Sequence, residues 1–385
     1  MPAERPIYLD HNATTSVDPA VLAAIRPYLE VEFGNPSSGH EYGRAAREAV
    51  EHARRQVAEL LGVGPAEIVF TGGGSEADNL AICGVAFSQR DRGRHIVTTA
   101  VEHPAVLNTC RYLQRRHGFA VTVVPVDRAG LVDPDDVRRA FRDDTILVSV
   151  MHAQNEVGTI QPVTEIAAAA REHGIAFHTD AAQSVGKVPV PVQDLGVDLL
   201  AVAGHKLYAP KGVGALYVCP GLTLEPLIHG AGHEGGHRAG TENVAGIVGL
   251  GKACALARKH LSEEASRIQG LCDELWRRLA GGIPGLRLHG HRERRLPNTL
   301  NVGVPGVAGE DLLAAVPGIA ASTGSACHAG RTEPSGVLLA MGLGPAEALT
   351  AVRLSLGRFT TDEDVRRAAD LLTTAAAALG KARRG

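Results

Sequence analysis

Short apolar segments alternate with helical segments along the chain, and this rhythm constrains the fold more than any other feature. Apolar runs at 67–71, 95–99, 120–125, 145–151 and 175–180 have the length of buried strands, and helical patterns of roughly 10–15 residues separate most of them. Strands joined in this way pair in parallel, because each helix carries the chain back across one face of the sheet. The sequence therefore predicts an α/β fold with a mostly parallel sheet covered by helices on both faces.

A change of composition predicts a second, smaller domain. A long helical stretch rich in Ala, Leu and Arg lies at about 244–280, and short strands and helices follow it. A chain of 385 residues is long enough for one large domain and one smaller domain. We expect residues 15–255 to form the large domain, and residues 1–14 together with 256–385 to form a smaller α+β domain.

Charge and cysteine usage exclude several function classes. The net charge is −3 and the only basic cluster is a short one at 381–384, so we expect no nucleic-acid binding. The six cysteines are scattered without a CxxC pair, which predicts no metal site, no disulfide framework and a reduced, cytoplasmic protein. The first residues do not resemble a signal peptide, and no apolar run is long enough to span a membrane.

A carboxylate and a lysine follow neighbouring predicted strands. Lysine is rare, with six against 33 arginines, and Lys206 ends the run Gly-His-Lys after a strand expected at 197–203. Asp180 ends the strand before it. Pyridoxal 5′-phosphate needs this pair, because a lysine amine holds its aldehyde as a Schiff base and a carboxylate keeps its ring nitrogen protonated. We therefore predict a pyridoxal phosphate site at the carboxyl ends of these strands.

A glycine-rich turn offers a place for the phosphate. Residues 71–76 read Thr-Gly-Gly-Gly-Ser-Glu and join a predicted strand to a predicted helix. Glycines let the backbone approach a phosphate, the helix N-terminus attracts it, and Ser75 adds a hydroxyl. A capped helix behind a tight turn is the alternative. His205 either faces the same phosphate or is a hydrogen-bonded core histidine.

Three further polar residues are candidates for contacts with the ring. His103 follows a strand and can stack on the ring or move protons, although it can equally begin a helix together with Pro104. Asn155 can donate to the ring hydroxyl, or serve as an ordinary turn amide. Gln183, three residues after Asp180, can reach the same hydroxyl.

A cysteine and an arginine complete the candidate chemistry. Cys327 lies in a breaker-rich segment at 322–336, where an accessible thiol can act as a nucleophile or be an unremarkable loop residue. Arg353 is a lone arginine in an apolar strand and needs a partner, either a substrate carboxylate or a structural salt bridge. Arg358, by contrast, is expected at the surface.

These motifs together resemble the cysteine desulfurases of the class V aminotransferase group, over nearly the whole chain. The matching segments lie at 8–15, 34–38, 67–76, 102–103, 155–158, 178–183, 204–206, 240–243, 324–327 and 353–358. The resemblance implies a pyridoxal phosphate enzyme of fold type I. Its roles for the residues are an internal aldimine on Lys206, phosphate binding by Gly74, Ser75 and His205, ring contacts from Asp180, Asn155, Gln183 and His103, and substrate binding by Arg353 and Asn155. Thr241 would reach the phosphate of a neighbouring subunit, which implies a homodimer.

The resemblance also implies the reaction. L-Cysteine would be converted to L-alanine, with Lys206 moving the Cα proton and with the sulfur carried as a persulfide on Cys327 for transfer to an acceptor protein. Iron–sulfur cluster assembly, tRNA thiolation and a dedicated pathway are the open destinations. Selenocysteine lyase is the main alternative, which His328 favours and Pro104 disfavours. A transaminase and a non-catalytic sulfur-relay protein are further alternatives, and Ala203 departs from the hydroxyl residue common at its position.

Overall fold

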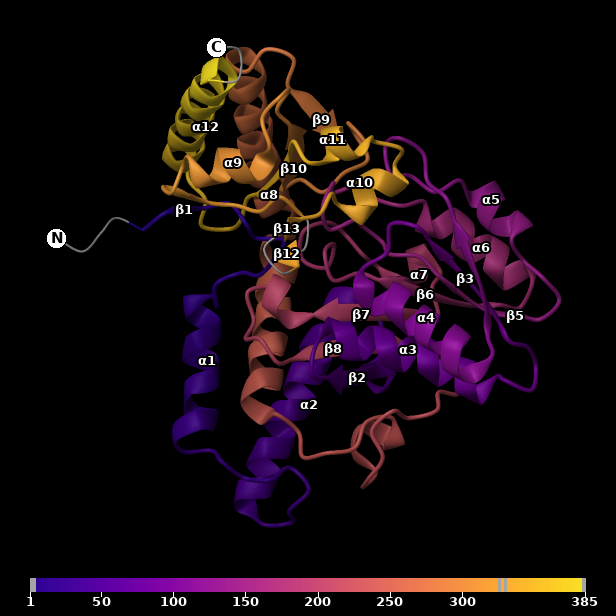
Figure 1. Ribbon diagram of the computed structural model, residues 1–385. Helices are drawn as coiled ribbons and strands as arrows, with labels where there is room; N and C mark the ends of the chain where they lie inside the picture. Colours follow the sequence, from indigo (N-terminus) through magenta and orange to yellow (C-terminus); the bar gives the residue numbers. More distant parts are fainter. Residues whose placement is uncertain (1–4, 325–326, 329–330, 383–385) are drawn as a thin grey trace.

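The computed structural model describes residues 5–324, 327–328 and 331–382, without the side chains of 327–328, 331–332 and 382. Figure 1 shows a larger body built around a seven-stranded sheet and a smaller body beside the other end of the long helix α8 (Val244–Gly282). In the described ranges, no helix is both long and apolar enough to cross a membrane.

The large sheet is mostly parallel, as predicted. Its strand order is β2-β8-β7-β6-β5-β3-β4, and β8 alone runs against its two neighbours. The tight connection from β7 to β8 explains this exception, because a parallel neighbour requires a long crossover. The strands are β2 (Ile68–Thr71), β3 (His95–Thr99), β4 (Ala120–Val124), β5 (Thr145–Ser149), β6 (Ala176–Asp180), β7 (Leu199–Ala203) and β8 (Gly214–Val218).

Helices cover both faces of this sheet. Side chains alternate along each strand, so that Leu199 and Ala201 of β7 join one core cluster while Leu200 and Val202 join the other. The first cluster lies under α3 and α4, and the second lies under the remaining large-body helices. The helices are α1 (Pro19–Glu30), α2 (Glu41–Leu61), α3 (Gly74–Ser88), α4 (Pro104–His117), α5 (Pro134–Arg139), α6 (Val163–Glu172) and α7 (Val192–Leu195).

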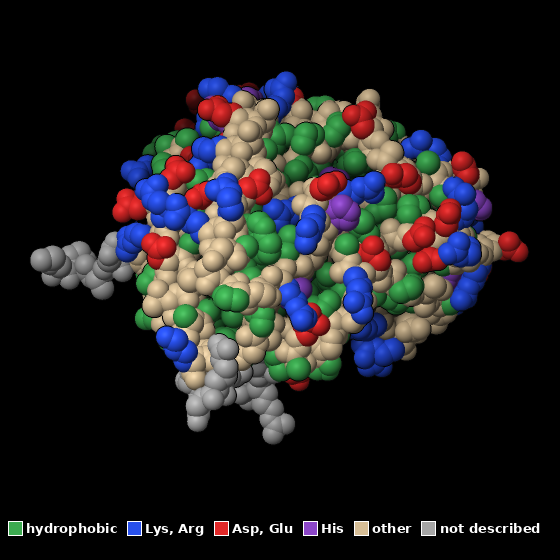
Figure 2. Space-filling view, turned by 90° about the horizontal axis from the view of Figure 1, so that it is seen from above, with side chains coloured by type: hydrophobic (Ala, Val, Ile, Leu, Met, Phe, Trp, Pro, Cys, Tyr) green, Lys and Arg blue, Asp and Glu red, His purple; other side chains and the backbone are tan. Residues whose placement is uncertain are grey.

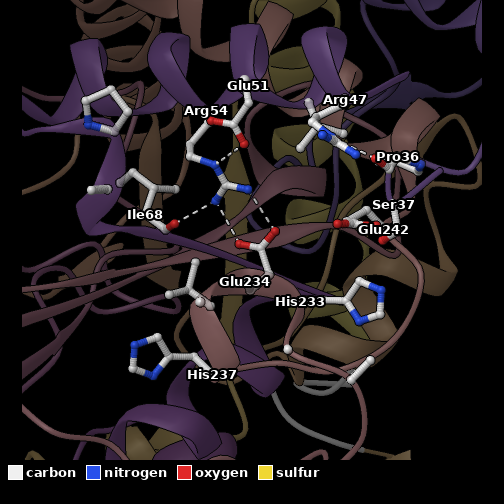
Figure 3. Close-up of a pocket in the computed structure, with 17 residues that line it drawn as sticks. Pro36, Ser37, Arg47, Glu51, Arg54, Ile68, His233, Glu234, His237 and Glu242 are labelled. Carbon is white, nitrogen blue, oxygen red and sulfur yellow. Dashed lines mark hydrogen bonds and ion pairs between the residues drawn. The ribbon is translucent and has the colours of Figure 1, made fainter. Parts of the chain in front are cut away.

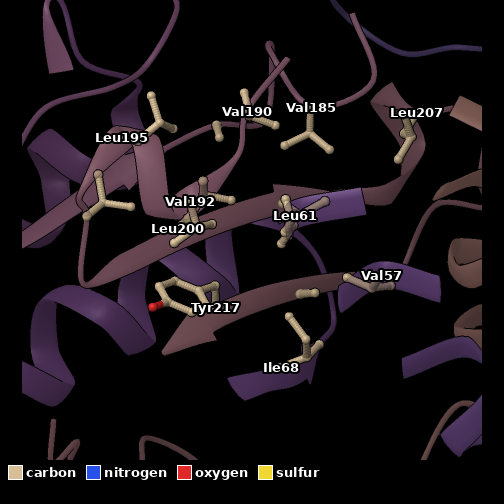
Figure 4. Packing of buried hydrophobic residues seen from close by; sticks show 14 of the residues in the cluster. Val57, Leu61, Ile68, Val185, Val190, Val192, Leu195, Leu200, Leu207 and Tyr217 are labelled. Carbon is tan, nitrogen blue, oxygen red and sulfur yellow. The ribbon is translucent and has the colours of Figure 1, made fainter. Parts of the chain in front are cut away.

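The second cluster joins distant parts of the chain. Figure 4 shows Leu200 and Tyr217 of the sheet beside Val57 and Leu61 of α2. Helix α8 crosses α2 so closely that a Cβ on Gly251 would come within 2.6 Å of the Cα of Ala53. The small residue is therefore required for the packing of the two helices.

A three-stranded antiparallel sheet forms the centre of the smaller body. Its order is β14-β10-β9, with β9 (Arg287–His289), β10 (Thr299–Gly303) and β14 (Ala351–Ser355). The long helix α12 (Asp362–Ala382), α9 (Gly309–Ala314) and the second half of α8 pack against this sheet, and β1 (Ile7–Tyr8) pairs in parallel with β11 (Ile319–Ala320). Ile7 and Leu9 share a core cluster with buried residues of α8, α9, α12, β10 and β14, so both ends of the chain contribute to the core of this smaller body. The boundaries near 15 and 255 stay a prediction.

The segment at 322–336 is less irregular than predicted. Strand β12 (Cys327–His328) pairs antiparallel with β13 (Arg331–Thr332), and α10 (Gly336–Ala340) and α11 (Pro345–Ala348) follow. Two-residue strands cannot be predicted from hydrophobic periodicity, because an alternation of apolar and polar residues is recognisable only over four or more residues. Short helical turns elsewhere are η1 (Pro65–Glu67), η2 (Gly204–Lys206) and η3 (His233–Gly236).

Charges of both signs are interspersed over the face shown in Figure 2. The view agrees with the small net charge of −3.

Candidate active site

Most of the predicted site residues come together around one cavity. It has a volume of about 560 Å³ and lies where β5, β6 and β7 end. Parallel strands present their carboxyl ends at one edge of the sheet, so side chains far apart in sequence meet there. The predicted residues that line it are Gly74, Ser75, His103, Asn155, Asp180, Gln183, His205 and Lys206.

The N-terminus of α3 forms one wall of this cavity. The helix begins at Gly74, and Gly73 before it has φ 151°, which favours glycine. A Cβ on Gly74 would lie 3.0 Å from the Cβ of Ala203, so β7 and the turn are in close contact. The fifteen-residue helix directs free backbone N–H groups at the cavity, which makes this wall suitable for a phosphate.

His205 is a half-buried, hydrogen-bonded residue that lines the cavity. Its Nδ1 lies 3.1 Å from the hydroxyl oxygen of Thr14, and its carbonyl accepts from the backbone and the hydroxyl of Thr15. Burial lowers the pKa of His205 to about 4, with nearby Lys206 adding to the effect. The ring is therefore neutral at pH 7, and it reaches the cavity as a hydrogen-bonding group rather than as a charge.

Lys206 lies in η2, directly after β7, and lines the cavity. Burial lowers the pKa of its amine, Asp180 acts in the opposite direction and Arg353 lowers it further. A lowered pKa increases the fraction of free amine, which is the form that attacks an aldehyde. The surroundings therefore favour the nucleophilic role predicted for this lysine.

Asp180 is accompanied by a second buried carboxyl group that the sequence did not indicate. Asp180 accepts from the backbone N–H of Ala182 at 2.8 Å. Ligand-type atoms of Asp78, His103 and Asp180 lie within 4.8 Å of one another. Burial raises the pKa of Asp78 well above its usual range, and Asp180 and Glu102 add to this. The sequence did not indicate Asp78, since only the tertiary structure reveals that its face of α3 is buried.

His103 both caps the N-terminus of α4 and lines the cavity. Its Nδ1 accepts from the backbone N–H of Ala105 at 3.1 Å. In the neutral ring the proton must then be on Nε2. Burial lowers the pKa of His103, Asp180 opposes this and Lys206 adds to it. The helix cap thus orients the ring, so the two interpretations of His103 are compatible.

A buried hydrogen-bond network surrounds Gln183 and includes residues that sequence reasoning missed. The Nζ of Lys187 donates to Oε1 of Gln183 at 2.9 Å and to Oδ1 of Asn12 at 3.2 Å. Gln183 in turn donates from Nε2 to the backbone oxygen of Asn12, and Asn12 donates to the backbone oxygen of Asn155. Burial lowers the pKa of Lys187 well below its ordinary value, with Lys206 and Arg353 adding to it. The short spacing from Gln183 to Lys187 was the only available signal.

Arg353 contacts Asn155, which lines the cavity, and is already paired. Its Nη2 is 2.8 Å from Oδ1 of Asp10, and its Nη1 donates to the backbone oxygen of Asn155 at 3.1 Å. Arg353 therefore forms a structural salt bridge, and N–H groups of its guanidinium remain available to another anion. The expectation for Arg358 was wrong, because its side chain is only 11% exposed, pairs with Asp18 and Glu264, and stacks on a tyrosine ring.

A family model described as Aminotransferase class-V matches residues 7–368. The chain belongs to the class-V aminotransferase family. Two curated relatives are each named Cysteine desulfurase IscS. The one from Dictyoglomus turgidum (strain DSM 6724 / Z-1310) is 48% identical over 371 residues, covering 96% of this chain and 94% of the relative. The one from Methanosarcina thermophila is 49% identical over 369 residues, covering 95% and 91%.

A solved structure confirms the fold of this class-V aminotransferase. A chain named NifS-like protein superposes with a TM-score of 0.90 at 38% identity, covering 97% of this chain and 99% of that chain. The predicted fold type I of pyridoxal phosphate enzymes is thus confirmed, and pyridoxal 5′-phosphate is the cofactor.

The residues around the cavity fit this cofactor. Two buried carboxyl groups, Asp78 and Asp180, lie close together, and Oδ1 of Asp78 has no hydrogen-bond partner among the described residues, although Nε2 of His178 is 3.5 Å away. Burial lowers the pKa of His178 to about 4, so its imidazole is neutral at pH 7, and a protonated pyridine nitrogen would supply these carboxyl groups with a positive charge. The N-terminus of α3 could bind the phosphate, and the amine of Lys206 could bind the aldehyde.

Three predicted residues of this class-V aminotransferase are not among those that line the cavity, namely Arg353, Thr241 and Cys327. Thr241 is exposed, in the connection between η3 and α8. Cys327 has its backbone in β12, while its side chain lies outside the described part of the chain. Their predicted roles stay predictions.

A larger cavity of about 1020 Å³ lies elsewhere and has a different character. Figure 3 shows Arg54 extending into it from α2, where Glu234 and Glu51 accept its hydrogen bonds. The guanidinium is thus already neutralised by two carboxylates. The smaller cavity is the better candidate for catalysis, although it has the lower volume. It brings together a lysine, two buried carboxyl groups and a helix N-terminus, whereas no lysine is among the described residues that line the larger cavity.

Proposed function

We propose that the protein is a pyridoxal phosphate-dependent cysteine desulfurase, which converts L-cysteine to L-alanine and carries the sulfur as a persulfide on Cys327. The convergence of Lys206, Asp180 and His103 on one cavity carries this proposal. The relatives named cysteine desulfurase, at 48% and 49% identity, support it.

The cofactor, when bound, withdraws electrons from the Cα of the substrate and so acidifies its proton. We assign Lys206 to hold the aldehyde and, once released, to move that proton. Asp180 holds the ring nitrogen, His103 stacks on the ring, and Asn155 and Gln183 reach the ring hydroxyl. The remaining proposed contacts are those of the phosphate with Gly74, Ser75 and His205.

Arg353 and Asn155 are proposed to bind the substrate. The guanidinium of Arg353 can hold the α-carboxylate in a bidentate manner. The carboxylate of Asp10, 2.8 Å from Nη2, must then share Arg353 or give way. The α-carboxylate of the substrate therefore has to compete with the carboxylate of Asp10 for the guanidinium of Arg353.

Sulfur transfer is assigned to Cys327. Its thiolate attacks the substrate sulfur, so a sulfur–sulfur bond forms as the substrate carbon–sulfur bond breaks. The electron pair of the broken bond stays on the carbon side, which is then protonated and leaves as alanine. The persulfide passes to an acceptor protein, and iron–sulfur cluster assembly is the destination that we propose first.

We propose that the protein acts as a homodimer in the cytoplasm. Thr241 is exposed and does not line the cavity of its own protomer, which supports a role at the phosphate of the other protomer. In an isologous dimer each protomer would place its Thr241 at the phosphate of the other protomer, so this contact would occur twice.

Borohydride reduction and peptide mapping test the cofactor linkage. The expected result is one pyridoxyl group, on Lys206, and its absence in Lys206→Ala. A pyridoxyl group on another lysine, such as Lys187, would overturn the assignment.

A second experiment tests the sulfur chemistry. Cys327→Ser should keep the visible absorbance of bound cofactor and lose persulfide formation, whereas Cys219→Ser should keep both. Sulfur transfer at the wild-type rate by Cys327→Ser would contradict the proposed role. Turnover of L-cysteine and L-selenocysteine by both proteins separates the desulfurase from a selenocysteine lyase, since only the desulfurase requires the thiol.

A further inference from the structure

The side chain of Glu156 contacts both ends of the segment that carries Cys327. Its Oε2 accepts from the hydroxyl of Ser335 at 2.5 Å, across 179 residues of sequence. A Cβ on Gly324 would lie 2.8 Å from the same oxygen, so this glycine packs directly against the carboxyl group. Gly324 has φ 76°, a left-handed conformation that favours glycine. One buried carboxyl group thus touches residues eleven positions apart.

The turn that carries Glu156 is itself firmly held. Its backbone N–H donates to Oε1 of Gln154, and its carbonyl accepts from Nδ2 of Asn301 at 3.2 Å. Asn155, the preceding residue, lines the cofactor cavity. The position of the carboxyl group is therefore fixed relative to the site.

The start of the segment is also connected to the site. The backbone of Arg353 donates to the carbonyl of Ser322 at 2.7 Å and forms a bridge with it. Figure 1 places β12 and β13 at the junction between the larger and the smaller body. Both bodies therefore meet where this segment begins.

Helix capping alone does not account for the buried carboxyl group. Ser335 already caps α10 through its own oxygen, which accepts from the backbone N–H of Leu338 at 3.3 Å. Burial raises the pKa of Glu156 to about 7, while Ser335 and Arg353 act in the opposite direction. Burying a carboxyl group is costly, so its contacts with the two ends of this segment have to offset the lost hydration.

We propose that Glu156 is a positioning residue for Cys327, which anchors both ends of the segment so that the thiol stays within reach of the cavity. Cys327 is three residues from Gly324, so a fixed anchor confines it to within about 10 Å of that point. A confined thiol has a high effective concentration at the substrate sulfur. The inference rests on the proposed role of Cys327 in sulfur transfer.

The test compares wild-type holoenzyme with Glu156→Ala, Glu156→Gln and Glu333→Ala. Glu333 is an exposed glutamate of the same segment and serves as the matched control. Alkylation of Cys327 by iodoacetamide is followed by mass spectrometry of its peptide without substrate. Persulfide formation is then measured with L-cysteine, together with the change in cofactor absorbance on adding it.

Glu156→Ala should raise the alkylation rate about tenfold, because the segment is no longer anchored and the thiol meets the reagent more often. Persulfide formation should fall about tenfold, because the effective concentration of the thiol at the substrate sulfur falls. The cofactor absorbance and its response to L-cysteine should not change. Glu156→Gln should retain most of the wild-type rates, since its amide oxygen still accepts from Ser335. Glu333→Ala should match the wild type.

Unchanged alkylation and persulfide formation in Glu156→Ala would overturn the proposal, as would an equal effect in Glu333→Ala. If Glu156→Ala does not fold, Ser335→Ala removes the same contact from the other side, with Ser335→Thr as the variant that keeps the hydroxyl. Alkylation needs no substrate, so it tests the anchor even if the wild type forms no persulfide and the proposed function fails.

Discussion

The guanidinium of Arg353 is held by the carboxylate of Asp10, 343 residues earlier in the chain, with Nη2 2.8 Å from Oδ1. The same group donates from Nη1 to the backbone oxygen of Asn155, and its Nε has no partner among the described residues. The arginine that we assign to the substrate is thus oriented in advance by an internal anion. Two predictions follow from this competition between carboxylates.

Arg353→Ala should raise the KM for L-cysteine about 10- to 100-fold, since charge-assisted hydrogen bonds contribute about 1.5–3 kcal/mol. The cofactor absorbance should remain. Steady-state kinetics provide the measurement, with Arg287→Ala, at an exposed pair with Glu347, as the control. A KM equal to that of the wild type would remove Arg353 from the substrate site.

Asp10→Asn should act in the opposite direction. Without the internal carboxylate, the α-carboxylate of the substrate meets an unpaired guanidinium, so the KM should fall severalfold. The buried guanidinium loses its partner, and the thermal midpoint of unfolding should therefore fall as well. Kinetics and calorimetry on the same preparation check both changes, and a raised KM would contradict the competition.

Ala203→Ser should strengthen cofactor binding. Ala203 lines the cavity against Gly74, at the wall proposed for the phosphate. A hydroxyl there adds one hydrogen bond of about 1 kcal/mol, which corresponds to roughly a fivefold lower Kd. Titration of the apoprotein with pyridoxal phosphate measures this, with Ala203→Gly as a variant without a donor. Equal affinities would show that the hydroxyl cannot reach the phosphate.

Lys187→Met should change how stability depends on pH. Burial lowers the folded-state pKa of Lys187 below its unfolded value, with Lys206 and Arg353 adding to this. Between those two values the unfolded chain binds more protons, so the free energy of unfolding rises with pH in that window. Lys187→Met should remove this rise, which urea unfolding at successive pH values can measure. Lys259→Met, at an exposed position, should retain the wild-type slope.

Gly324→Ala should loosen the same anchor as Glu156→Ala. Its Cβ would meet Oε2 of Glu156 at 2.8 Å, in addition to a backbone strain of about 1–2 kcal/mol at φ 76°. Alkylation of Cys327 should speed up in each single variant, and the double variant should be no faster than Glu156→Ala. Gly342→Ala has a similar strain at φ 83° but open space around it, so it should leave alkylation unchanged. If the increase in alkylation rate in the double variant equals the product of the two single increases, the two residues act independently.

Much of the architecture could be predicted because strands and helices have different periods. The strand predicted at 95–99 is β3 as observed, and the strand predicted at 120–125 differs from β4 by one residue. The long segment near 244–280 is the single helix α8. Predictions failed for β11 and for β12 with β13, since two-residue strands leave no periodic trace. Pairing depends there on neighbours that the local sequence does not contain.

The candidate site divides in the same way. Asp180 and Lys206 could be found because a strand end before a polar residue is visible locally, and parallel strands bring such ends together. Asp78, Asn12 and Lys187 could not be found, because their importance lies in burial and in partners far along the chain. Lys187, for example, donates to Asn12 across 175 residues.

The order of apolar and polar residues by itself determined the α/β layers and the edge of the sheet where chemistry collects. Only the tertiary structure decided which charges lie close together there, such as Arg353 with Asp10 and Asp78 with Asp180. The physical reason is that periodicity depends on near neighbours, whereas desolvation and Coulomb interaction depend on distances in space that folding alone sets.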